Sequence, residues 1–370
     1  MVWTLIAVAA FLAIPGIFDG MALGQTGDAG GNGIGVLDFM DIRDSDGVRA
    51  TSYQFSTDEG SLFEPGNTMR SALIHIELQI WLFLQIPACE FVGFAAGYEW
   101  LDPFHRAMIG VAEGITRQVA TPLVLITAAA IGSLIVALFI ARGFYSRATT
   151  QICFMLLVAV LSPVFLAEPL AEVLSPDGLL AQGRDLGISV AAGLNGNANP
   201  NPADQVEVMQ AGLVDNLVRH PLQTWNFGHV VDRSPVCREA WSAAVVVGDG
   251  SDIREAMRDC GDSAAHARAS EPSWGQVGSG LVIILLSPLA SLVLVILSFM
   301  IVRDGCYAIY HGFMMIFGFA AGGFIYGPTQ NFLIRNVVDA FVAAGRMSAF
   351  TIFLGVYTLF LNNLFLQAGG

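Results

Sequence analysis

The sequence predicts an all-α fold: a polytopic bundle of transmembrane helices, with amphipathic interfacial helices and one large, mostly helical polar loop. Two observations predict it. The chain is 54% hydrophobic and only 13% charged, and apolar runs of 18 or more residues recur along it. Each such run is long enough to cross a hydrocarbon core of about 30 Å. Because backbone amides in lipid must be satisfied within their own segment, these runs are expected to be helical.

The N-terminal part divides into two segments. Residues 1–24 contain a short apolar run, which is either the hydrophobic region of a signal peptide or a short first span. Residues 25–70 are rich in Gly, Asp and Ser and hold few apolar clusters. We expect this second segment to be a tail or linker that orders on contact, with short strands or docked turns at residues 35–39 and 50–55.

The first membrane half is predicted over residues 71–174. It contains three apolar runs, and an amphipathic interfacial helix is expected between the first and second of them. Pro163 and Pro169 interrupt the third run, so we expect that helix to be kinked and packed against neighbours. The predicted spans are 71–97, 121–141 and 152–174, and the amphipathic helix covers 102–118.

The second membrane half is predicted over residues 277–370, after a polar loop over residues 175–276. Its first two apolar runs are separated only by Arg303-Asp304-Gly305, which indicates a tight helical hairpin. An amphipathic segment again precedes the last run. The predicted spans are 277–302, 306–326 and 347–367, and the amphipathic segment covers 331–346.

Two identical pentapeptides, Gly-Phe-Ala-Ala-Gly, recur in the two halves. Their glycines are Gly93 and Gly97 in the first half and Gly318 and Gly322 in the second. The GxxxG spacing lets helix backbones approach closely. We expect helix packing at both sites, although chance recurrence is an alternative in a chain rich in Gly and Ala.

Polar side chains in the first span are a second packing signal. The polar load is unusual for a lipid-facing helix and is expected to face other helices or a wet cavity. It consists of His75, Glu77, Gln79, Gln85 and Glu90. Helix–helix hydrogen bonding is the favoured role, and a solute pathway is the alternative.

The polar loop carries its own helix signals and two of the five cysteines. Asp204 with Glu207, and Asp252 with Glu255, have the spacing of a helix start. We expect two or three short helices, the first ended by Pro221. Cys237 and Cys260 are disulfide candidates; two unrelated free thiols are the alternative.

The side of the membrane on which the loop lies is not decided by the arginine counts of the short loops. A Cys237–Cys260 disulfide would persist only in an oxidising compartment. The cysteine pair therefore favours an extracytoplasmic loop.

The charge of the loop argues against direct DNA binding. Residues 174–275 hold seven Arg and thirteen Asp or Glu, a difference of −6. A surface that binds phosphate backbones should be basic. Contact with a protein partner is therefore the favoured role of the loop.

Catalytic signatures are missing from the sequence. It contains no HExxH, GxSxG or Walker phosphate loop, and its cysteines and histidines lack the spacing of a zinc site. We therefore predict no enzyme activity, no catalytic residue, no metal and no cofactor.

A family resemblance rests mainly on the polar loop. The order Arg-x-Pro-x-x-x-x-Asn-Phe-Gly, then Cys, then Cys-Gly resembles the TrbL-type polytopic subunit of conjugative type IV secretion systems, in its actinobacterial version. The likeness covers most of residues 35–365, with low specificity outside the loop. The matching residues here are Arg219, Pro221, Asn226, Phe227, Gly228, Cys237, Cys260 and Gly261.

The resemblance implies a multi-pass component of the plasma membrane that contributes to the route of a DNA–protein complex. It implies a homo-oligomer in the lipid bilayer, with other type IV secretion subunits and conjugation ATPases as partners and only indirect contact with the translocated complex. Docking of the loop against neighbours would use Arg219, Pro221, Trp225, Asn226, Phe227 and Gly228.

A small-solute or ion transporter is the alternative function. It is favoured by the three-plus-three arrangement of spans, the proline-broken helix and the buried polar residues His75, Glu77 and Glu90.

Overall fold

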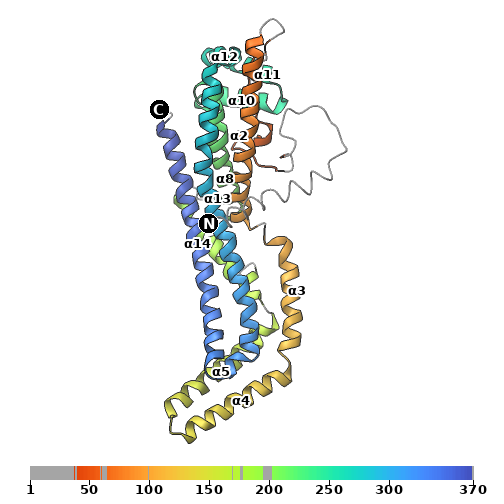
Figure 1. The fold of residues 1–370 in the computed structure, drawn as a ribbon, viewed down its shortest axis with the longest axis vertical. Helices are drawn as coiled ribbons and strands as arrows, with labels where there is room; N and C mark the ends of the chain where they lie inside the picture. Colours follow the sequence, from red (N-terminus) through yellow and green to blue (C-terminus); the bar gives the residue numbers. More distant parts are fainter. Residues whose placement is uncertain are drawn as a thin grey trace. The chain divides into compact units, whose positions relative to one another are not determined.

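The computed structural model describes residues 37, 40–58, 60, 65–98, 100–168, 170–175, 178–194 and 202–368. The predicted signal peptide or short first span at residues 1–24 lies outside this range. The all-α prediction is confirmed: the described residues form helices, one isolated bridge between Arg43 and Arg49, and no strand. Figure 1 shows the order of the helices along the chain.

The first membrane half contains four main helices. α2 (Pro65–Gly97) and α4 (Pro122–Ala141) cover the first two predicted spans, and α3 (Asp102–Val119) covers the predicted amphipathic helix. α5 (Tyr145–Ala167) begins seven residues before the third predicted span and keeps Pro163 inside it. The short α6 (Ala171–Leu174) ends this half, and α7 (Leu179–Leu194) is the first helix of the polar loop.

The polar loop is helical, as predicted. α8 (Pro202–Val214) continues through a π-helical turn (Asp215–Arg219) directly into α9 (His220–Phe227), so the prediction that Pro221 ends the helix is wrong. Pro221 follows the π-helical turn directly, at a point where the regular α-helical hydrogen bonding is already interrupted. The remaining loop helices are α10 (Pro235–Val247), α11 (Gly250–Asp259) and α12 (Ser263–Ser270).

The predicted hairpin at Arg303-Asp304-Gly305 is also wrong. Trp274–Ala320 form one continuous helix of 47 residues, α13. Arg303 and Asp304 pair with each other at 2.8 Å inside the helix. Gly305 serves packing rather than a turn, because a Cβ there would come within 2.8 Å of the Trp100 ring.

The final helix, α14 (Pro328–Ala368), joins the predicted amphipathic segment and the last predicted span into one element. A short 3-10 turn (Gly322–Phe324) separates it from α13. Five helices among the described residues are long and apolar enough to cross a membrane, in agreement with a membrane protein: α2, α4, α5, α13 and α14.

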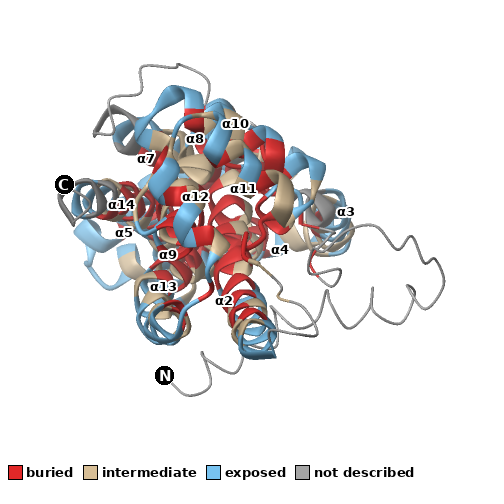
Figure 2. Cartoon of the chain, turned by 90° about the horizontal axis from the view of Figure 1, so that it is seen from above, coloured by how far each residue is buried: buried red, intermediate tan, exposed pale blue. Residues whose placement is uncertain are grey.

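The chain forms two compact units, and both combine distant segments. The first unit holds Met1–Phe94, Ala192–Phe299 and Leu354–Gly370; the second holds Ala95–Ala191 and Met300–Phe353. The buried residues of the first unit lie mainly on α2, α9 and α10, with fewer on α11 and α12 (Figure 2). The five consecutive segments predicted from the sequence describe placement in the membrane rather than packing, so that division stays a prediction.

Within the first unit, α2 and α13 run in the same direction. Arg70 Nη1 donates to the carbonyl of Pro272 at 2.8 Å, just before α13. Further along, Trp81 Nε1 donates to Ser287 Oγ at 2.9 Å. The numbers of the contacting residues increase in the same direction along both helices. The segments that precede α2 and α13 therefore lie at the same end.

Within the second unit, the C-terminal part of α13 packs against α14, α5 and the break between α5 and α6. His311 Nδ1 lies 2.8 Å from Asn336 Oδ1, and Ser162 Oγ donates to the carbonyl of Phe319 at 2.9 Å. Gln330 Nε2 donates to Gln151 Oε1 at 2.6 Å. These hydrogen bonds satisfy polar groups among apolar helices.

Candidate functional site

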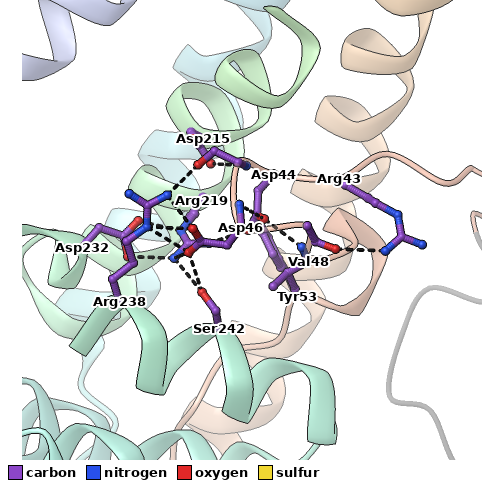
Figure 3. A network of polar contacts seen from close by, with 12 residues as sticks. Arg43, Asp44, Asp46, Val48, Tyr53, Asp215, Arg219, Asp232, Arg238 and Ser242 are labelled. Carbon is purple, nitrogen blue, oxygen red and sulfur yellow. Dashed lines mark hydrogen bonds and ion pairs between the residues drawn. The ribbon is translucent and has the colours of Figure 1, made fainter. Parts of the chain in front are cut away.

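The candidate site is the buried cluster around Arg219, in the first unit (Figure 3). The guanidinium has no solvent exposure. Its Nε and Nη2 donate to the two carboxylate oxygens of Asp232 at 2.6 and 3.0 Å, and its Nη1 donates to Asp44 at 2.5 Å. Nη2 also lies 2.7 Å from Asp46 and donates to Ser242. Every nitrogen of the guanidinium therefore has a hydrogen-bond acceptor.

Asp44 and Asp46 belong to residues 40–58, which form a folded turn. Oδ1 of Asp44 accepts from the backbone amides of Asp46 and Val48 at 2.9 and 2.8 Å. Gly47 takes φ of +78°, a conformation that favours glycine. Tyr53 donates its hydroxyl to Oδ2 of Asp44 at 2.6 Å. The turn therefore presents both carboxylates to Arg219.

The electrostatics of the cluster hold its groups in fixed protonation states. Burial alone raises the pKa of Asp232, but hydrogen bonds from His220 and Arg219, together with the charge of Arg219, lower it well below its ordinary value. Burial and the neighbouring Asp44 raise the pKa of Tyr53. Tyr53 therefore stays protonated and acts as a donor, and Asp232 stays ionised.

Asp215 differs from Asp232, because the pKa of its carboxyl is raised rather than lowered. Burial raises the pKa of its carboxyl, the nearby Asp44 raises it further, and hydrogen bonds from Ser45 together with the charge of Arg219 oppose that rise. It accepts from the Ser45 amide at 3.3 Å. Chemically, the arrangement is a network of buried ion pairs that attaches residues 40–58 to the loop helices.

Residues 53–57 continue from this turn as an extended segment among α9, α10 and α11. Asn226, with its amide nitrogen toward the carbonyl of Ser56, donates at 2.8 Å and accepts from the Ser56 amide at 2.9 Å. Ser56 Oγ donates to the carbonyl of Gly250 at 2.8 Å, and Arg254 donates to the carbonyl of Thr57. Loop residues thus form hydrogen bonds with this extended segment, as a neighbouring strand would in a sheet.

Aromatic rings fill the space around this segment. Tyr53 meets Trp241 edge-on with ring centroids 5.3 Å apart, and Phe55 meets Trp225 in the same way at 5.0 Å. Trp225 also packs against Trp81 of α2. All five rings are buried. Edge-to-face pairs contribute beyond the area they bury.

The predicted disulfide is confirmed: Cys237 at the start of α10 is bonded to Cys260 at the end of α11. Gly261 follows with φ of +94°, and Gly228 ends α9 with φ of +87°. Both glycines therefore occupy positions that disfavour other residues.

The candidate docking residues lie mostly inside the fold, and their contact with other proteins stays a prediction. Arg219, Trp225, Asn226 and Phe227 are buried and contact other parts of the same chain, while Pro221 is half-buried and only Gly228 is exposed. Trp225 Nε1 donates to the carbonyl of Gln276 at 2.7 Å. Arg219 and Asn226 contact residues 40–58, and Trp225 contacts the start of α13, so these three side chains are used within the chain.

The predicted buried polar set of α2 is partly supported. His75, Glu77 and Glu90 are half-buried, but Gln79 is exposed. Gln85 is the fully buried polar residue of this helix; it donates to Ser287 at 3.0 Å and accepts from Ser291. Gln85 lies four residues after Trp81 and therefore on the same helix face, and this spacing indicates that the two side chains are buried together.

The predicted packing glycines meet different neighbours. A Cβ at Gly93 would contact the side chain of Gln210 in α8, and one at Gly318 would contact Leu333 in α14 at 2.7 Å. Gly97 is the last residue of α2, and Gly322 lies in the 3-10 turn after α13. Close approach is therefore present at Gly93 and Gly318.

The sequence did not single out four central residues of the cluster, Asp44, Asp46, Asp232 and Trp241. A faint signal existed in Asp44-Ser45-Asp46-Gly47, which is typical of a side-chain-supported turn. Across the described residues, no group of three His, Cys, Asp or Glu could hold a metal ion.

No protein-family model, curated protein or solved structure matches the chain.

Proposed function

We propose that the chain is a non-catalytic, multi-pass plasma-membrane subunit of a conjugative type IV secretion apparatus, similar to the TrbL type. In this role it contributes to the translocation channel or its scaffold. Its partners are further copies of itself, other secretion subunits and the conjugation ATPases that supply energy.

The observation that carries the proposal is where the residues of the resemblance lie. Arg219, Asn226 and Phe227 are buried in the core of the loop helices. Gly228 and Gly261 take left-handed conformations, and the two cysteines close α10 onto α11. The shared residues are therefore those that specify one folded domain, so the likeness concerns a domain rather than scattered positions.

Packing supports one common side of the membrane for residues 40–58 and the loop helices. Residues 40–58 are buried against the loop helices, so both lie on one side, and an even number of crossings separates them. Three candidate helices lie between, namely α2, α4 and α5. Either one of these does not cross completely, or one further segment crosses. A Cys237–Cys260 disulfide persists only in an oxidising compartment, which favours an extracytoplasmic position for this common side.

Deletion of residues 205–262 tests the proposal in a mating assay. We expect transfer to be lost while the protein still inserts into the membrane, as measured by fractionation. Arg258→Ala is the matched control, because the Arg258 side chain is exposed and pairs with its neighbour Asp259 at 3.2 Å. Normal transfer by the deletion variant would contradict the proposal.

A small-solute or ion transporter is the second candidate, and one observation favours it. Asp304 is buried in the apolar α13, and its Oδ2 has no hydrogen-bond partner among the described residues. Intramembrane carboxylates often mark ion pathways. If the chain is a transporter, uptake should be lost at an unchanged protein level in the variants Asp304→Asn, Glu77→Gln and Glu90→Gln. If it is a secretion subunit, variants of the loop should instead reduce DNA transfer.

A further inference from the structure

The extended segment 53–57 is buried without secondary structure of its own. Residues 40–58 contain one isolated bridge and one 3-10 turn (Ala50–Ser52). Nevertheless Tyr53, Phe55 and Ser56 are at most 2% exposed. The burial is supplied by α9, α10 and α11, which follow in the chain more than 160 residues later. The segment is therefore bound by these helices as a ligand is bound by a receptor.

Two kinds of contact recognise the segment. The first is made to its backbone, by the paired hydrogen bonds of Asn226 to Ser56 and by Arg254 to the carbonyl of Thr57. Such contacts accept an extended chain of many sequences, as in strand-like peptide recognition. They require only that the bound chain be extended at this point.

The second kind of contact selects side chains. Tyr53 and Phe55 are two residues apart, so they lie on one face of the extended chain, and they pack on Trp241 and Trp225. Upstream, the acidic pair Asp44 and Asp46 meets Arg219, and Asp46 also meets Arg238 at 2.5 Å. The selected pattern is two acidic residues followed by aromatic-x-aromatic.

We propose that α9, α10 and α11 form a peptide-recognition groove for an extended segment with an acidic pair and an aromatic-x-aromatic motif. Residues 40–58 occupy this groove within the same chain. A peptide of the same chemistry competes for it when the internal segment is weakened. Asp232 pairs with Arg219 from within the groove, so the guanidinium keeps a counter-charge when the segment leaves. The inference goes beyond the secretion role and holds for either candidate function.

The test uses the full-length protein in detergent and a fluorescent synthetic peptide of residues 40–58. The internal segment is weakened by Tyr53→Ala with Phe55→Ala. We expect saturable binding to this variant by fluorescence anisotropy and binding at least tenfold weaker to the unmodified chain, whose groove is occupied. A peptide with both aromatics replaced by alanine should bind at least tenfold more weakly.

A groove variant and a control locate the binding. Adding Arg254→Ala to the weakened chain should reduce affinity for the peptide, because Arg254 contacts the segment backbone. Adding Arg258→Ala, on the same helix but exposed, should leave the affinity unchanged. A weakened chain that keeps its disulfide and a cooperative melt, yet does not bind the peptide, would overturn the proposal.

A second measurement decides the matter if the weakened chain does not fold. Hydrogen exchange of the unmodified protein should show the amides of Asp46, Val48 and Ser56 exchanging together and faster than those of α10 and α11. That result means that the segment leaves the groove while the receptor helices remain folded. Equal exchange rates would make the segment an inseparable part of the core and refute the groove.

Discussion

Arg219 and Asp44 form a fully buried ion pair although 175 residues separate them, with Nη1 of the arginine 2.5 Å from Oδ2 of the aspartate. Arg219 also stacks over the Trp241 ring, with its guanidinium carbon 4.7 Å from the ring centroid. One side chain thus joins the N-terminal turn, the π-helical turn and α10. The cluster is the structural centre of the first unit.

Replacing Arg219 by Met should strongly destabilise this unit. The change leaves Asp44 and Asp232 buried without their counter-charge, which typically costs about 3–5 kcal/mol. Thermal unfolding in detergent, followed by tryptophan fluorescence, measures the loss. Arg219→Lys should recover only part of it, because an ammonium group cannot reproduce the forked contacts. Arg258→Ala should change the unfolding midpoint little.

Stability of the cluster should fall in acid. Despite burial, which raises it, the pKa of Asp232 is lowered below its ordinary value of 3.8 by His220 and Arg219. A carboxylate with a lowered pKa contributes stability that is complete above its unfolded value and is lost as the pH falls through its folded value. We therefore expect constant fluorescence of the loop tryptophans from pH 7 down to about pH 4 and a loss of structure below that.

Asp215→Asn should act in the opposite direction to the arginine variants. Burial and Asp44 raise the pKa of the Asp215 carboxyl, so its charge is unfavourable at neutral pH. The amide keeps an oxygen that accepts from the Ser45 backbone. The variant should have a higher unfolding midpoint than the parent at pH 7, and the difference should shrink as the parent carboxyl protonates. An equal or lower midpoint at pH 7 would contradict this account.

Removing the disulfide should loosen the loop helices. Cys237 and Cys260 are 23 positions apart in the sequence, for which chain-entropy arguments give about 3 kcal/mol. The Cys237→Ser, Cys260→Ser double variant should be cleaved faster by proteases in the loop. Cys153→Ser, which removes a free exposed cysteine, is the control. In the parent, an impermeant thiol reagent should label residues 237 and 260 only after reduction.

Gln85→Ala should weaken the contact of α2 with α13. The change removes a buried donor and acceptor and leaves Ser291 short of its partner, at a cost of about 1–3 kcal/mol. Gln79→Ala changes the same residue type at an exposed position of the same helix. It should alter stability by less than about 0.5 kcal/mol. Similar melting points for the two variants would mean that Gln85 does not join the helices.

The sequence predicted helices well because apolar runs and caps are local signals. The polar loop was predicted to be helical from Asp252 and Gly261, and the Cys237–Cys260 bond was anticipated. The hairpin at Arg303-Asp304-Gly305 failed because charge and glycine also occur inside a helix when the charges pair and a tryptophan packs on the glycine.

The candidate site was less predictable because its contacts are distant in sequence. Nothing local in Asp44 indicates Arg219, and the turn that presents it has only a weak sequence signal. Arg219 and Asn226 were noticed, but their burial could not be read from a polar loop of net negative charge. Their partners come from residues 40–58, which the composition describes only as a tail or linker.

The separation of Asp44 from Arg219 also sets an order on synthesis. At about 5–20 residues per second, a ribosome makes the aspartate roughly 10–35 s before the arginine. The N-terminal turn is therefore made before the candidate membrane helices α2, α4 and α5, and before its partner Arg219. Completion of the buried cluster then becomes a late step in biogenesis. A chain whose first helices are misinserted would place the two halves of the cluster on opposite sides of the membrane and leave it unassembled.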